Sequence, residues 1–145
     1  MIEIKKISAD DLKGLKILYE DGFEDKVDFE KMREVFNTIR DKPEYYLLCA
    51  RSDGKVVGSA MGILCQELYG KCLPFMIIEN LVVLSGYRRS GIARKLLNYL
   101  EELAVQHKCT MIILVASEHR SGAHRLYESV GYGEDKVRGF RKKLI

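Results

Sequence analysis

The sequence has 145 residues, of which 47% are apolar and 31% charged, so it is long enough for one domain with a buried core. Its longest apolar runs, such as Met111–Ala116, are too short to cross a bilayer. The opening MIEIKK lacks the apolar core of a signal peptide. These features predict a cytoplasmic protein without membrane association.

Charge is distributed unevenly along the chain. Residues 1–85 hold 12 Lys/Arg and 15 Asp/Glu, whereas residues 86–145 hold 12 Lys/Arg and 6 Asp/Glu, for net charges of −3 and +6. A basic half indicates an anionic partner. The basic residues are not interleaved with aromatic ones, as binding to single-stranded nucleic acid requires. We therefore expect a small polyphosphate ligand and no nucleic acid.

The cysteines give no sign of a metal site. They show no C-x-x-C spacing and no histidine pattern suited to zinc. We expect them to be reduced core or strand residues, and we expect no metal. They are Cys49, Cys65, Cys72 and Cys109.

The first half of the chain predicts a strand, two helices and three strands. Alternation predicts a strand over 2–7, and Ser8 with Asp11 predicts the start of a helix through Leu12, Leu15, Leu18 and Tyr19. Asp28 is expected to cap a second helix that ends before Pro43. The turn Asp53-Gly54 predicts a hairpin over 45–65, followed by a strong strand over 73–84.

The second half predicts helix, strand, helix and strand. The clearest helix runs from Ser90 to about Gln106, and a buried strand follows over 109–116. A short helix within 120–132 should end at Gly131, and 138–144 alternate like a last strand. The order β-α-α-β-β-β-α-β-α-β favours an α/β or α+β fold with a mixed, mostly antiparallel central sheet flanked by helices. No repeat or linker interrupts it, so we expect a single domain over 1–145.

The stretch GYRRSGIARKLL, residues 86–97, places two arginines and a glycine just before this clearest helix. Amide groups in the first helical turn have no partner within the helix, and with the helix dipole they attract phosphate. Gly91 and Ala93 keep the backbone approachable, while Arg88 and Arg89 add charge. A cradle for a diphosphate is one interpretation, and a solvated basic helix start is the other. The stretch is neither a Walker A loop nor a dinucleotide fingerprint.

A second motif, AHRLYESVGY at 123–132, lies downstream in the same order as in a known family. With R-R-S-G-I-A at 88–93 it resembles the GCN5-related N-acetyltransferase (GNAT) family, which transfers acetyl from acetyl-CoA to an amine. The strand and helix order resembles the family's fold over essentially the whole chain. The sequence departs from the commonest pattern at Arg89, Ala93 and Arg120, and Arg120 leaves the polar contacts near the pantetheine arm open.

The resemblance implies roles for particular residues. Tyr127 would protonate the leaving CoA thiolate and contact the cofactor, and Glu79 would take a proton from the substrate ammonium or bind it. The backbone of Leu81, Val82 and Val83 would pair with pantetheine, with Arg120 close to that arm. The diphosphate cradle would consist of Arg88, Arg89, Ser90, Gly91, Ile92, Ala93 and Arg94.

Simpler interpretations stay open beside these roles. Tyr127 is also compatible with a core aromatic residue, and Glu79 with a residue facing solvent or a salt bridge. His107, His119 and His124 are expected at the surface.

The acceptor is indicated only by charge. The acidic stretch 20–30 would suit a cationic amine, or it is a solvated helix connection. The sequence favours an acetyl-CoA-dependent N-acetyltransferase acting by direct transfer in a ternary complex. The alternative is a non-catalytic acyl-CoA-binding regulatory module, and a homodimer is left open.

Overall fold

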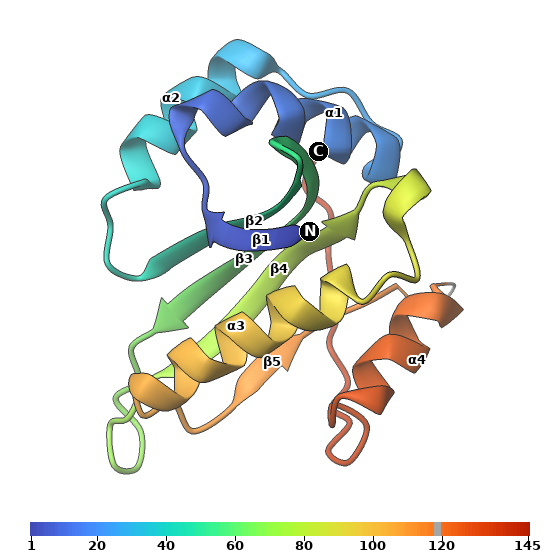
Figure 1. Cartoon of the computed structure of the whole chain (residues 1–145). Coiled ribbons are helices and arrows are strands. Elements are labelled where there is room, and N and C mark those ends of the chain that lie inside the picture. Colours follow the sequence, from blue (N-terminus) through green and yellow to red (C-terminus); the bar gives the residue numbers. More distant parts are fainter. Residues whose placement is uncertain (118–119) are drawn as a thin grey trace. The chain divides into compact units, whose positions relative to one another are not determined.

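The computed structural model describes residues 1–117 and 120–145, which divide into two compact units, residues 1–113 and 114–145. The first unit contains all but the last helix and the end of the last strand (Figure 1). In chain order the elements are β1 (Ile2–Lys6), the 3₁₀ turn η1 (Ala9–Asp11), α1 (Leu12–Phe23), α2 (Phe29–Ile39), β2 (Tyr45–Ser52), β3 (Lys55–Cys65), β4 (Phe75–Val83), η2 (Ser85–Tyr87), α3 (Ile92–Gln106), β5 (Ile112–Leu114) and α4 (Ser121–Ser129).

The strands form one sheet in the order β1-β2-β3-β4-β5. The pairs β1–β2, β2–β3 and β3–β4 are antiparallel. Asp53 and Gly54, with φ of 49° and 79°, form the two-residue turn between β2 and β3. Two positive φ angles match the twist of a hairpin, so the predicted hairpin is confirmed.

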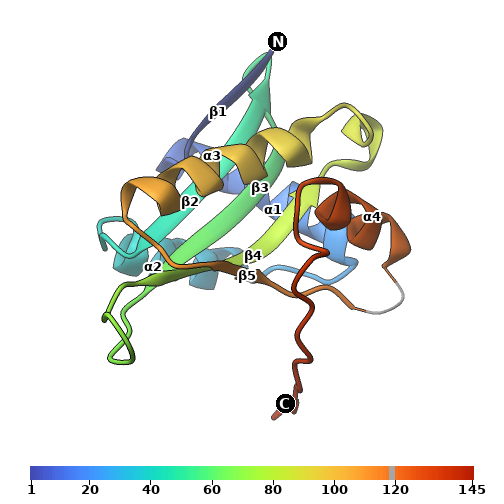
Figure 2. The same ribbon diagram turned by 90° about the horizontal axis from the view of Figure 1, so that it is seen from below.

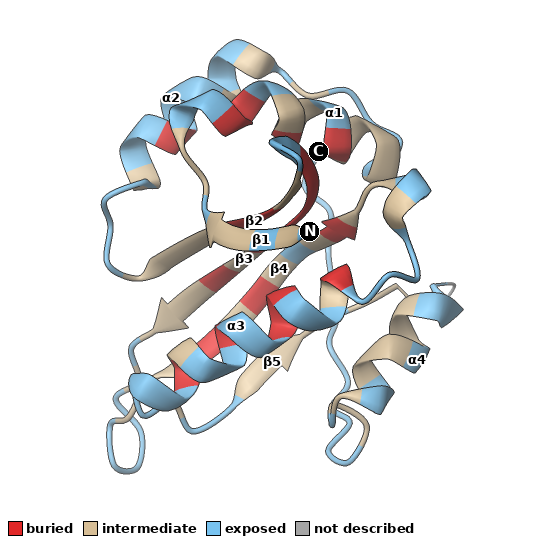
Figure 3. Ribbon diagram, viewed as in Figure 1, coloured by how far each residue is buried: buried red, intermediate tan, exposed pale blue. Residues whose placement is uncertain are grey.

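Helices cover both faces of this sheet. α1 and α2 lie on one face and α3 lies on the other (Figure 1), and α3 runs over the strands in the view from below (Figure 2). A stripe of buried residues on α3 faces the sheet (Figure 3). Its members recur at helical spacing, as amphipathic packing requires. They are Ile92, Leu96, Leu97, Leu100 and Ala104.

The predicted starts of the first two helices are confirmed, and the first of them also makes a contact with the sheet. The Asp11 carboxylate accepts hydrogen bonds from the backbone amide of Ser8 at 2.8 Å and from its hydroxyl at 3.0 Å. It also pairs with the guanidinium of Arg51 on β2. Asp28 caps α2 by accepting from the Lys31 amide at 3.1 Å. The Ser8–Asp11 motif therefore joins the entry of α1 to the sheet as well as starting the helix.

Two sequence predictions are corrected by the structure. The strand expected over 109–116 contains only Ile112–Leu114 and is half-buried. The strand expected over 138–144 is wrong, because these residues form neither helix nor strand and their large apolar side chains Phe140 and Leu144 are exposed. Alternation gives a segment two different faces but does not supply a partner strand.

The four cysteines are free, as expected, and Cys49 and Cys65 lie in strands, but the expectation of a core or strand position is wrong for Cys72, which is exposed in a loop. Cys49 is buried on β2, and burial raises the pKa of its thiol to about 11. Among the described residues, no helix combines the length and the apolar character needed to span a membrane.

Candidate functional site

The start of α3 presents backbone rather than side chains. Gly91 precedes the helix with φ of 83°, and a Cβ added there would meet nothing within 4 Å. In the part of the chain that the structure describes, no side chain caps this helix. Ser90, which an N-cap role would suit, donates its hydroxyl to the Tyr87 carbonyl instead. The backbone around Gly91 is therefore open and uncapped by a side chain, as an anion site at a helix start requires.

The two arginines before the helix differ in their surroundings. The Arg88 Nε donates to the Val83 carbonyl at 3.2 Å, which bends this side chain back over the end of β4. Arg89 is exposed and adopts a φ of 61°, an uncommon conformation for a non-glycine residue. The chain thus turns sharply between Arg88 and Gly91 before α3 begins at Ile92. This start lies two residues after the predicted Ser90.

β4 contains a bulge at the predicted pantetheine-binding stretch. Met61 of β3 pairs with Glu79 and Ser59 pairs with Val82, so Asn80 and Leu81 together oppose a single residue of β3. Asn80 has a φ of 55°, which asparagine tolerates better than most residues. β5 has three residues against nine in β4, so it can pair with only part of that strand.

Val82 belongs to the core between the sheet and α1 and is 5% exposed. Leu81 and Val83 are half-buried. The core interpretation of these side chains is therefore confirmed for Val82. A buried side chain does not occupy the backbone of the strand. One edge of β4 pairs with β3, and β5 is too short to pair with the whole of the other edge, so part of the β4 backbone is open to another role.

Glu79 is half-buried beside the bulge. A carboxylate at the boundary of the core does not carry the desolvation cost of a fully buried charge. The Glu79 carboxylate is therefore placed where it can contact a polar ligand, and its burial does not require an ion pair within the protein.

A carboxylate that the sequence analysis did not single out joins α1 to the loop before α3. Both oxygens of Asp21 accept from Ser85: Oδ2 from the backbone amide at 2.9 Å and Oδ1 from the hydroxyl at 2.8 Å. The Arg88 guanidinium lies 3.8 Å from Oδ2. The hydrogen bonds from Ser85, followed by the charge of Arg88, lower the pKa of Asp21. No local pattern reveals a contact across 64 residues.

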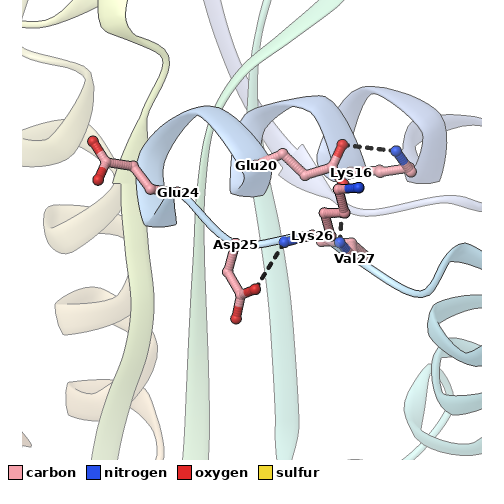
Figure 4. A pocket seen from close by; sticks show the side chains of 6 residues that line it. All are labelled: Lys16, Glu20, Glu24, Asp25, Lys26 and Val27. Atoms are coloured by element: carbon pink, nitrogen blue, oxygen red, sulfur yellow. Dashed lines mark hydrogen bonds and ion pairs between the residues drawn. The ribbon is translucent and has the colours of Figure 1, made fainter.

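The turn after α1 encloses a shallow hollow (Figure 4). Glu20 closes the turn, because its Oε1 accepts from Lys16 Nζ at 2.7 Å and its Oε2 from the Val27 amide at 2.9 Å. These bonds, the one from Lys16 foremost, lower the pKa of Glu20. Glu24 extends away from this pair and Asp25 lies on the turn itself (Figure 4). The lining residues are Lys16, Glu20, Glu24, Asp25, Lys26 and Val27.

The second unit contains α4 and the second motif. The half-buried Tyr127 packs edge-on against Tyr132, with ring centroids 6.3 Å apart. The Tyr127 carbonyl accepts from the Tyr132 amide at 3.0 Å, and Gly131 reverses the chain with a φ of 100°. The helix end at Gly131 is confirmed. Arg120 is exposed and directly precedes α4.

The two histidines that the structure describes differ in their surroundings. His107 is exposed, with its Nε2 2.5 Å from the Tyr46 hydroxyl. His124 is half-buried, with its Nε2 2.8 Å from the Ser117 carbonyl. His119 lies outside the described residues. Within residues 1–117 and 120–145, no group of three or more His, Cys, Asp or Glu side chains is arranged to hold a metal ion.

A profile of the Acetyltransferase (GNAT) family matches residues 12–132, which include most of each unit and both motifs. The chain belongs to the GNAT family. This family uses acetyl-CoA as its acetyl donor, so the family expected from the two motifs is confirmed, as is its α/β fold.

Known GNAT proteins resemble the chain in sequence and in fold. It is 35% identical over 72 residues to an aminoglycoside N(6')-acetyltransferase type 1 of Acinetobacter haemolyticus, covering 49% of this chain and 50% of that protein. The chain thus matches about half the length of this curated relative. A putative acetyltransferase from Agrobacterium tumefaciens superposes with a TM-score of 0.87 at 26% identity, covering 97% and 99% of the two chains. AAC(6')-Iy, solved with the bisubstrate analogue CoA-S-monomethyl-acetylneamine, superposes with a TM-score of 0.81 at 18% identity, covering 99% of each chain, and shows the shared fold.

Proposed function

We propose that this chain transfers acetyl from acetyl-CoA to a primary amine, in a ternary complex of protein, donor and acceptor. The observation that carries the proposal is the start of α3, where Gly91 exposes uncapped backbone next to two arginines. Donors in the stretch 89–94 would hold the CoA diphosphate, and the charge of Arg88 and Arg89 would offset that of the phosphates. Membership of the GNAT family supports this assignment.

Groups of this chain perform each step of the transfer. Glu79 takes a proton from the substrate ammonium, directly or through water, and the free amine attacks the thioester carbonyl carbon. A backbone amide of β4 at or near Val82 stabilises the charge that develops on the carbonyl oxygen. The carbon–sulfur bond then breaks, and the hydroxyl of Tyr127 protonates the departing thiolate. Tyr127 suits this step because its phenol carries a hydroxyl proton that it can donate. The nitrogen of the new amide loses its second proton, which restores the hydroxyl of Tyr127.

The acceptor is a cationic amine that binds at the acidic turn after α1. The stretch 20–30 carries six acidic residues and one lysine. Glu24 and Asp25 are exposed and line the hollow, so they are available to a bound cation. The aminoglycoside acetyltransferases among the relatives act on one class of polycationic amine, which supports this acceptor class.

Two measurements test the proposal. Calorimetry should detect acetyl-CoA binding to the wild type, and Gly91→Val should weaken it at least tenfold, because it strains a positive φ and fills the cradle. Gly54→Val is the matched control, since Gly54 also has a positive φ but lies in the β2–β3 turn. Thiol release with a panel of mono- and polyamines then identifies the acceptor. Binding without thiol release for any amine would favour a non-catalytic acyl-CoA-binding module, and no binding would refute the proposal.

A further inference from the structure

Asp21 fixes both ends of η2, the turn that leads from β4 towards α3. It accepts from the amide and the hydroxyl of Ser85 at 2.9 and 2.8 Å, and its Oδ2 lies 3.8 Å from the guanidinium of Arg88. Arg88 in turn donates to Val83, the last residue of β4. A single carboxylate of α1 thereby defines the path of the chain from the end of β4 to the first residue of the candidate cradle.

The neighbouring residue brings α1 close enough for these bonds. A Cβ placed on Gly22 would lie 2.1 Å from Cγ2 of Val82. The last turn of α1 is therefore seated directly on the end of β4. The loop that follows is held from two sides, by its own strand and by α1.

We propose that Asp21 is a positioning residue for the cofactor diphosphate. This inference rests on the proposed function. Asp21 holds Ser85 to Arg88 in place before the ligand arrives, so binding does not have to order this loop. Asp21 is partly exposed, and ion pairs with exposed partners contribute little to folding. Its loss should therefore weaken ligand binding far more than it lowers the stability of the protein.

The test compares acetyl-CoA with S-acetyl-pantetheine, a donor that lacks the diphosphate. In Asp21→Ala we expect the Kd and KM for acetyl-CoA to rise at least tenfold while kcat changes less than twofold. The kcat/KM for S-acetyl-pantetheine should stay within twofold of wild type. Ser85→Ala should raise the Kd and KM for acetyl-CoA less, because the backbone amide of residue 85 still donates to Asp21.

Asp28→Ala is the matched control. Asp28 lies seven residues away and caps α2 through the Lys31 amide. Its loss should lower the melting temperature and leave the Kd for acetyl-CoA unchanged. Should Asp21→Ala fail to fold, Asp21→Asn replaces it, since the amide keeps one acceptor oxygen but sets a second donor against the Ser85 amide.

Two results would overturn the inference while leaving the proposed function intact. One is an unchanged Kd for acetyl-CoA in the Asp21 variant, and the other is an equal loss of kcat/KM for acetyl-CoA and for S-acetyl-pantetheine. A wild-type protein that takes up no acetyl-CoA would instead refute the proposed function itself.

Discussion

Gly22 of α1 and Val82 of β4 lie so close together that no side chain fits between them: a Cβ on Gly22 would be 2.1 Å from the Val82 Cγ2. Val82 is buried and its branched side chain has few alternative rotamers. We predict that Gly22→Ala destabilises the protein by about 1–3 kcal/mol, because overpacking outweighs the gain of about 1 kcal/mol in helix propensity. Urea unfolding measures the change.

A double mutant isolates this contact. Val82→Ala removes the clashing methyl group, so Gly22→Ala should cost less in the Val82→Ala background than in wild type. Equal effects in both backgrounds would show that the destabilisation arises elsewhere.

The ion pair between Asp11 and Arg51 should make stability depend on pH. Burial alone would raise the pKa of Asp11, but the hydrogen bonds from Ser8 and Arg51 and the charge of Arg51 outweigh it and lower the pKa. A lowered folded-state pKa contributes stability that is present above the unfolded value, near 3.9, and is lost as pH falls through the folded value. Asp11→Asn should therefore lower the free energy of unfolding at pH 7 by about 2 kcal/mol or more. This difference between wild type and variant should become smaller below pH 4.

The comparison is made by urea unfolding at pH 7 and pH 3. Asp10→Asn is the control, because Asp10 is adjacent and exposed. A gap between wild type and Asp11→Asn that stays constant from pH 7 to pH 3 would exclude the ionised Asp11 as its source.

Tyr127→Phe should reduce kcat at least tenfold and leave acetyl-CoA binding nearly normal. The substitution removes only the hydroxyl and keeps the ring that packs against Tyr132. Steady-state kinetics and calorimetry on the same preparation separate the two effects. Tyr132→Phe is the matched variant, and unchanged kcat in Tyr127→Phe would remove the assignment as general acid.

Glu79→Gln should lower kcat/KM for the amine at least tenfold without altering the Kd for acetyl-CoA. The amide can neither accept a proton at neutral pH nor balance the charge of an ammonium group. Glu3→Gln, on the exposed side of β1, should have no effect. A wild-type kcat/KM for the preferred amine would mean that Glu79 takes no part in the reaction.

Local signals in the sequence predicted the elements that depend on local chemistry. Asp53-Gly54 predicted the hairpin, because these residue types tolerate the two positive φ angles of a two-residue turn. Asp28 predicted the start of α2, because a capping side chain bonds to an amide only three residues away. The two GNAT motifs predicted the family, and the start of α3 was predicted at Ser90, two residues before Ile92.

Contacts between distant segments could not be read in this way. Asp21 appeared only as one acidic residue among several, since its partner Ser85 is 64 positions away. The bulge at Asn80 depends on pairing with β3, and alternation over 138–144 did not reveal that the segment lacks a partner strand.

The end of α1 and the turn that follows it contain two sets of residues with different surroundings. Asp21 and Gly22 face β4 and its loop, while Glu24 and the following Asp25 line the hollow. Under the proposed function, substitutions at Glu24 and Asp25 would change which amines the chain accepts and leave its binding of acetyl-CoA intact. The proposal thus assigns the acceptor and the donor to different residues of one short segment, which substitutions can address separately.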